Sequence, residues 1–229
     1  MFQGQDSLIW SYGFPYMAFK RFVAAILVGI ATLLPAGPSL AKTFRIVGFG
    51  DSLMAGYQLG PGQSFPDQLQ AELRKDGFDV AVANAGVSGD TTSDGLARLD
   101  WSIPDGTDMV LLELGSNDML RGIDPMVTKK NLDQMIRKLK ARKIGIVLMG
   151  MLAAPNLGAA YTSVFDAIYP ALAKQNGIPL YPFFLDGVAG HPDLQLADGM
   201  HPNLQGVAKM VQSALPAIED AIKSREKRS

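Results

Sequence analysis

The stretch MVLLEL at residues 109–114 has the pattern that decides the fold, a short run that is apolar almost throughout. A strand with one solvent-exposed face alternates apolar and polar residues, whereas a strand covered on both faces is apolar along its length. Similar short runs occupy residues 43–50, 80–84, 144–149 and 179–183. The sequence therefore predicts five strands of one parallel sheet that is covered on both faces.

Amphipathic stretches separate these runs, and they predict the helices that cover the sheet. Residues 63–75, 91–101, 125–141, 161–175 and 204–223 read as helices, with apolar side chains recurring at helical spacing. Alternation of strands and helices is typical of a parallel sheet between two helical layers. The predicted fold class is α/β, a three-layer α/β/α sandwich with a five-stranded parallel sheet of flavodoxin-like type.

Composition narrows the possible functions. The chain has 229 residues, of which 48% are hydrophobic and 19% charged, so it suits one folded domain. A formal net charge of −1 gives no electrostatic case for nucleic acid. The chain has no cysteine, which excludes disulfides, thiolate catalysis and cysteine-ligated zinc. His191 and His201 are its two histidines, so histidine chemistry has two candidates.

Residues 1–41 are expected to be an N-terminal extension and signal peptide. Two basic residues precede an apolar run at 22–34, which is short for a membrane span, and small residues precede a cleavage point after Ala41. An uncleaved membrane anchor is the alternative. We therefore expect a mature domain at residues 42–229 that has no stable membrane span and is periplasmic or secreted.

Small and polar residues follow the predicted strands. Ser52 follows the first strand, Gly89 the second and Asn117 the third, while Asp198 and His201 lie in the long loop after the fifth. In an open parallel sheet, ligands bind outside the carboxyl ends of the strands. We expect these five residues to meet at that edge.

These residue types suit nucleophilic catalysis. A serine hydroxyl needs a base, and a histidine held by a carboxylate supplies one. Asp198 and His201 are three residues apart, so a short turn can bring the carboxylate to the imidazole. The sequence predicts Ser52 as nucleophile, His201 as base and Asp198 as the residue that orients it. Candidate oxyanion donors are the backbone amides of Ser52 and Gly89 and the side-chain amide of Asn117.

Each of these residues also has an ordinary structural interpretation. Ser52 could cap a helix, Asp198 could belong to a simple turn, and Gly86 competes with Gly89 for the glycine role. The functional interpretation is favoured because four distant segments fall at the same sheet edge with complementary roles. Ser52 does not lie in a Gly-x-Ser-x-Gly motif, which argues against an α/β-hydrolase nucleophile elbow.

The sequence resembles the GDSL, or SGNH, hydrolase family at four motifs in the family's order. They are GDSL at residues 50–53, SG at 88–89, GSND at 115–118 and DGMH at 198–201. The resemblance covers roughly residues 44–222, and within the family it is greatest to the bacterial periplasmic group called arylesterase, thioesterase I or lysophospholipase.

The resemblance implies the α/β/α fold, the triad Ser52, Asp198 and His201, and the oxyanion donors Ser52, Gly89 and Asn117. It implies no metal and no organic cofactor. The expected partner is a small-molecule acyl ester or thioester, with lysophospholipid among the candidates, and the expected state is a monomer.

An apolar acyl pocket is expected from residues 149–156 and 183–185, although the same residues could be ordinary core. One alternative function is a carbohydrate O-acetylesterase of the same family, but two tryptophans in the chain give little sign of a sugar platform. The other is a non-catalytic flavodoxin-like binding module. The complete set of serine, asparagine, aspartate and histidine argues against that module.

Overall fold

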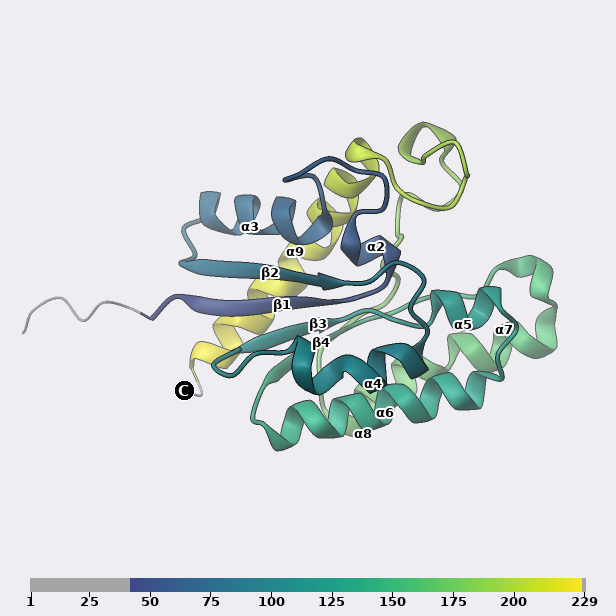
Figure 1. Ribbon diagram of the computed structural model, residues 1–229, viewed down its shortest axis with the longest axis horizontal. Coiled ribbons are helices and arrows are strands. Elements are labelled where there is room, and N and C mark those ends of the chain that lie inside the picture. The colour runs from purple at the N-terminus through teal and green to yellow at the C-terminus, as the bar shows by residue number, and fades with distance from the viewer. Residues whose placement is uncertain (1–41, 228–229) are drawn as a thin grey trace, which may run out of the picture. The chain divides into compact units, whose positions relative to one another are not determined.

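The computed structural model describes residues 42–227, so the predicted signal peptide lies outside the described residues (Figure 1). All strand pairs are parallel, and the strand order is β2-β1-β3-β4-β5. This order is the flavodoxin-like one and confirms the predicted sheet. The strands are β1 Phe44–Gly50, β2 Val80–Gly86, β3 Met109–Leu112, β4 Gly145–Met149 and β5 Leu180–Tyr181.

The central strands of the sheet are buried from solvent. All four residues of β3 are buried, and Arg45 is the one exposed residue of β1. The edge strand β2 is exposed or half-buried over most of its length. The apolar run at 109–114 therefore contains the central strand, which is buried on both faces of the sheet.

Two helical layers cover the sheet (Figure 1). Helices α3 (Phe65–Lys75) and α9 (Leu204–Glu226) pack together on one face. Helices α4 (Thr92–Ser102), α6 (Pro125–Ala141) and α8 (Ile168–Asn176) pack on the other. The three-layer α/β/α sandwich is confirmed.

Local sequence signals explain where several helices begin. Ser64 and Thr91 each form a capping box with the acidic residue three positions later, at the start of α3 and of α4. Asp124 caps α6, and Pro125 occupies its first turn, where no backbone donor is needed.

The single helix predicted at 161–175 is wrong, because the structure has two helices, α7 (Ala159–Asp166) and α8, which meet at Ala167. Pro170 has no N–H to bond the carbonyl of residue 166, so the helix is interrupted there. The side chain of Asp166 instead accepts the backbone N–H of Ala153 at 2.7 Å, which ties the interruption to the loop after β4.

The fifth strand is shorter than the predicted 179–183. Pro182 cannot donate to the ladder, and β5 ends at Tyr181. The remaining elements are short: α2 (Ser52–Ala55), α5 (Ser116–Leu120), η1 (Pro155–Leu157) and η2 (Pro192–Leu194). Within residues 42–227 no helix combines the length and the apolar character needed to cross a membrane.

Candidate active site

Ser52 is the first residue of α2, directly beyond the carboxyl end of β1, and its hydroxyl is not used as a helix cap. Asp51 is the N-cap, and its Oδ1 accepts the backbone N–H of Leu53 at 3.0 Å. The capping interpretation of Ser52 is therefore wrong. Its Oγ lies 2.9 Å from Nε2 of His201, a distance at which the imidazole can take the hydroxyl proton.

Asp198 holds His201 from the opposite side. Asp198 Oδ2 lies 2.7 Å from His201 Nδ1, and Asp198 Oδ1 accepts the backbone N–H groups of Met200 and His201 at 2.9 and 3.0 Å. These backbone bonds, with the imidazole bond, lower the pKa of Asp198 to about 2. The carboxylate is therefore ionised at neutral pH and can stabilise an imidazolium.

The loop that carries His201 is fixed at several points. Gln195 and Pro202 form an isolated β-bridge, and the ring of Tyr57 lies on the imidazole with centroids 4.5 Å apart. The other histidine, His191, is exposed at the start of η2. Of the two histidines, the structure therefore brings His201 to Ser52.

The candidate oxyanion donors come from three neighbouring segments. Nδ2 of Asn117 donates to Asp51 Oδ2 and to the Asp90 carbonyl, both at 3.0 Å, so α5 lies against the ends of β1 and of the loop after β2. A primary amide has two protons. A contact from Asn117 to an oxyanion therefore requires one of these bonds to be shared or exchanged when substrate binds.

The two competing glycines have different structural roles. A Cβ atom at Gly86 would lie 2.3 Å from the backbone nitrogen of Ala55, so Gly86 allows β2 to pack closely against α2. Gly89 has φ of +89°, in the region that favours glycine, and its carbonyl accepts a bond from Arg121 at 2.7 Å. Gly86 thus serves close packing. Gly89 directly precedes Asp90, whose carbonyl accepts the bond from Asn117.

Arg98 is a positioning residue that sequence reasoning missed. Its guanidinium donates to Asp90 Oδ2 at 2.5 Å and to the carbonyls of Gly50 and Ala85 at 2.9 and 2.8 Å. The side chain is buried and lies over the ring of Phe49. It thereby joins the ends of β1 and β2. The position of Arg98 in a predicted helix did not indicate that its side chain is buried, because an arginine on a surface helix usually faces solvent.

An apolar pocket of about 550 Å³ opens beside Ser52. Part of the predicted wall lines this pocket, namely residues 151–155, Phe183 and Leu185. Phe184 belongs instead to the core, where its ring packs edge-on against Phe65. Sequence reasoning missed the contribution of α5, where Met119 and Leu120 also line the pocket. Helix α5 is too short to show an amphipathic period.

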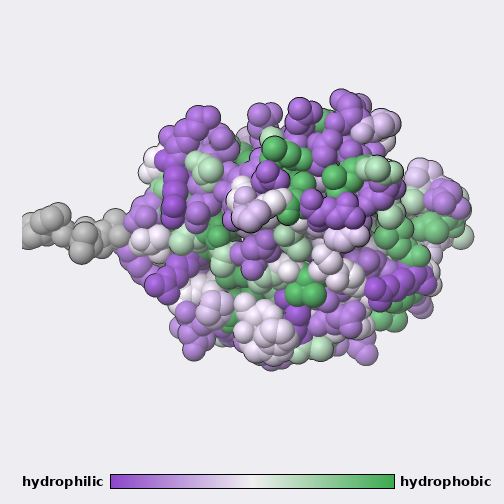
Figure 2. All heavy atoms as spheres, turned by 45° about the horizontal axis from the view of Figure 1, so that its top comes forward, coloured by the Kyte–Doolittle hydropathy of each residue, from purple (hydrophilic) through white to green (hydrophobic). Residues whose placement is uncertain are grey.

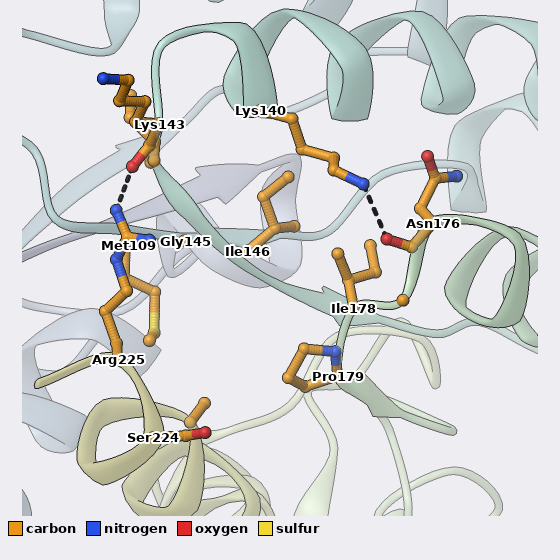
Figure 3. A pocket seen from close by; sticks show the side chains of 13 residues that line it. Met109, Lys140, Lys143, Gly145, Ile146, Asn176, Ile178, Pro179, Ser224 and Arg225 are labelled. Atoms are coloured by element: carbon orange, nitrogen blue, oxygen red, sulfur yellow. Dashed lines mark hydrogen bonds between the residues drawn. The ribbon is translucent and has the colours of Figure 1, made fainter. Parts of the chain in front are cut away.

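A second pocket, of about 530 Å³, lies at the opposite, amino edge of the sheet (Figure 3). Two of its basic side chains bond helix ends: Lys140 Nζ donates to the carbonyl of Asn176 at 2.8 Å, and Arg225 donates to the carbonyl of Lys143. Cations at helix C-termini stabilise the helix dipoles. These contacts explain Lys140 and Arg225 without a ligand.

Comparison with known proteins agrees with this geometry. The chain matches the GDSL-like Lipase/Acylhydrolase family over residues 49–209. It is 43% identical to "Arylesterase" of Vibrio mimicus over 159 residues, which are 69% of this chain and 80% of that protein. It is 39% identical to "Thioesterase 1/protease 1/lysophospholipase L1" of Escherichia coli (strain K12) over 172 residues, or 75% and 80% of the two chains.

The solved structure of AlinE4, an SGNH-hydrolase family esterase, is 46% identical, with a TM-score of 0.67 and coverage of 80% of this chain and 98% of that one. The fold and these similarities define a serine ester hydrolase of the α/β/α class. The chain belongs to the GDSL-like lipase/acylhydrolase family, as its four motifs predicted.

Proposed function

We propose that Ser52, His201 and Asp198 form the catalytic triad of this esterase. The observation that carries the proposal is one continuous chain of hydrogen bonds, from the Ser52 hydroxyl through the imidazole to the Asp198 carboxylate, at the mouth of an apolar pocket. A positioned base makes a serine hydroxyl nucleophilic, and a carboxylate bonded to the other ring nitrogen keeps the base in the required tautomer.

Hydrolysis then proceeds in two steps. Ser52 Oγ attacks the acyl carbonyl while His201 Nε2 takes its proton, and the backbone amides of Ser52 and Gly89 with Asn117 Nδ2 hold the oxyanion. The imidazolium gives that proton to the leaving alcohol or thiol as the bond to the carbonyl carbon breaks. Water, deprotonated by His201, attacks the acyl-enzyme and releases the acid and free Ser52.

The proposed substrates are acyl esters or thioesters, as in arylesterases, thioesterases and lysophospholipases. The pocket is lined mainly by aliphatic side chains, and exposed Leu120 and Leu152 carry the apolar surface out to its rim. Figure 2 shows hydrophobic residues at the end of the molecule where Figure 1 places α5 and α7. An acyl chain gains about 0.8 kcal/mol for each buried methylene, so such a pocket favours chains longer than acetyl.

A carbohydrate O-acetylesterase is less well supported, because acetyl would leave most of this apolar volume unfilled. We further propose that the enzyme works as a monomer in the periplasm or outside the cell, after removal of residues 1–41. The support is the basic pair and apolar run of the sequence before Ala41. Lysophospholipid is then an accessible substrate.

The test of substrate class is hydrolysis of p-nitrophenyl esters from acetyl to palmitoyl, with the folded Ser52→Ala variant as control. We expect activity that rises beyond acetyl and disappears with Ser52. Activity confined to acetyl esters would favour the O-acetylesterase, and activity that survives Ser52→Ala would exclude this triad.

A further inference from the structure

Two carboxyl groups lie directly beneath the nucleophile, and neither belongs to the triad. Asp51 precedes Ser52 and is 0% exposed, and Glu113, which follows β3, is 1% exposed. Glu113 Oε2 accepts the backbone N–H of Asp51 at 3.1 Å. Two carboxyl groups this close, buried from water, cannot both be ionised without a large cost.

The hydrogen-bond donors around the pair are unequally divided. Asp51 accepts bonds from the Ser116 hydroxyl, the Leu53 backbone N–H and the Asn117 side-chain amide. Glu113 accepts the one backbone bond, and its Oε1 has no partner within the described residues although it is buried. A buried oxygen without a hydrogen-bond partner costs more in an ionised carboxylate than in a neutral acid, because the charge is removed from water as well.

Electrostatics favours the same distribution of protons. Burial first, and then the negative charge of Asp51, raise the pKa of Glu113 well above its ordinary value. Burial raises the pKa of Asp51 above its ordinary value as well, but the bonds from Ser116, Leu53 and Asn117 oppose that rise. The proton therefore belongs on Glu113, and the charge on Asp51.

The other charged or titratable groups around the pair leave this distribution in place. Arg98 directs its guanidinium to Asp90 and to backbone carbonyls. Tyr169 donates to the Leu114 carbonyl, and its pKa is raised well above the ordinary value by burial and then by Glu113. Asp118 is bonded by Thr92 and Thr128, and His201 lowers the pKa of Asp51 without bonding to it.

We propose that Glu113 is a protonated positioning residue, so that the pair carries one negative charge and the ionised Asp51 holds Asn117 and Ser116 in place. This inference rests on the proposed function for its kinetic consequence, because Asn117 is the proposed side-chain oxyanion donor. If Glu113 lost its proton, a second negative charge would lie beneath the site where the oxyanion forms, and kcat would fall.

The decisive measurement does not depend on activity. Infrared spectra of the full chain are recorded at pH 8, where exposed carboxyl groups are ionised, for the wild type and for Glu113→Gln. We expect a protonated-carboxyl band in the wild type that Glu113→Gln removes. Absence of that band from the wild type, or its persistence in Glu113→Gln, overturns the proposal even if the esterase reaction is as proposed.

Kinetics separate positioning from simple structural support. Glutamine is neutral like the protonated acid and keeps an oxygen that can accept the Asp51 backbone N–H, whereas methionine has similar length and only a weak acceptor. We expect Glu113→Met to lower kcat about tenfold with little change in KM, less than the 10²–10³ of losing an oxyanion donor outright, and Glu113→Gln to recover most of that loss.

The dependence of kcat on pH gives a second test. It needs only the wild type and Glu113→Gln, so it remains usable if Glu113→Met does not fold. We expect the alkaline fall of kcat to be weaker in Glu113→Gln than in the wild type, because glutamine has no proton to lose. The positioning role would be excluded if kcat fell identically at alkaline pH in the wild type and in Glu113→Gln. It would also be excluded if folded Glu113→Met and Glu113→Gln had equal kcat.

Discussion

Arg98→Met tests the network that joins the strand ends beneath the site. Arg98 is 6% exposed, and its guanidinium bonds Asp90, the Gly50 carbonyl and the Ala85 carbonyl. Methionine fills most of the volume but leaves the Asp90 carboxylate, which is 9% exposed, without its cation. Removing one partner of a buried ion pair costs about 3–5 kcal/mol.

That loss is a large part of the stability of an ordinary domain, about 5–15 kcal/mol. In a domain of this size each kcal/mol shifts Tm by about 2–4 °C, so we expect a Tm lower by about 6–20 °C. Urea unfolding followed by circular dichroism measures the free energy directly. The matched control is Arg137→Met, because the Arg137 side chain is mostly exposed in its ion pair with Asp133 and the pair should contribute less than about 1 kcal/mol.

The double variant Arg98→Met/Asp90→Asn checks the cause. Neutralising Asp90 removes the uncompensated charge, so the double variant should be more stable than the sum of the single losses by about 0.5–3 kcal/mol. A loss below about 1 kcal/mol in Arg98→Met, or additive single losses, would refute the reasoning that the buried pair holds the strand ends together.

Four further predictions concern the site itself. Asp198→Ala should lower kcat less than Ser52→Ala, since the imidazole can still act with poorer orientation; equal losses in folded protein would contradict an orienting role. Asn117→Ala should lower kcat for a p-nitrophenyl ester by about 10²–10³, and an unchanged kcat would remove it from the oxyanion hole. Gly86→Ala should lower the free energy of unfolding by about 1–3 kcal/mol through its clash with Ala55, and a neutral effect in urea unfolding would contradict that close packing. Because the folded-state pKa of Asp198 is lowered to about 2, its ionised form adds stability at pH above the group's ordinary pKa of 3.8, and this stability is lost as pH falls toward 2. The difference in urea midpoint between wild type and Asp198→Asn should therefore narrow in acid, and a constant difference would argue against this linkage.

The layer arrangement was predictable because it depends on patterns that are local in sequence. The run at 109–114 identified a strand covered on both faces, and the α6 prediction agrees with Pro125–Ala141 because Pro125 marks its first turn. The interruption at Ala167 was missed because residues 161–175 show a nearly continuous helical pattern. It depends on Pro170 and on a bond from Ala153 to Asp166 that only the fold creates.

The site residues were predictable because the carboxyl ends of parallel strands converge at one edge. The roles of their neighbours were not predictable, because they depend on contacts across long sequence separations. Asp51, not Ser52, caps α2, and it receives bonds from Ser116 and Asn117, which are 65 and 66 residues away. Glu113 is the one charged residue of the run at 109–114, and its burial beneath the nucleophile is visible only in three dimensions.

The most direct test of the proposed triad is to find which side chain is the nucleophile. A fluorophosphonate probe forms a bond from its phosphorus to the activated serine oxygen with loss of fluoride, and peptide mass spectrometry then locates the adduct. We expect one adduct, on Ser52, and we expect the probe to label Ser52 far more slowly in His201→Ala. An adduct on another residue, or equally fast labelling of Ser52 without His201, would contradict the proposed triad.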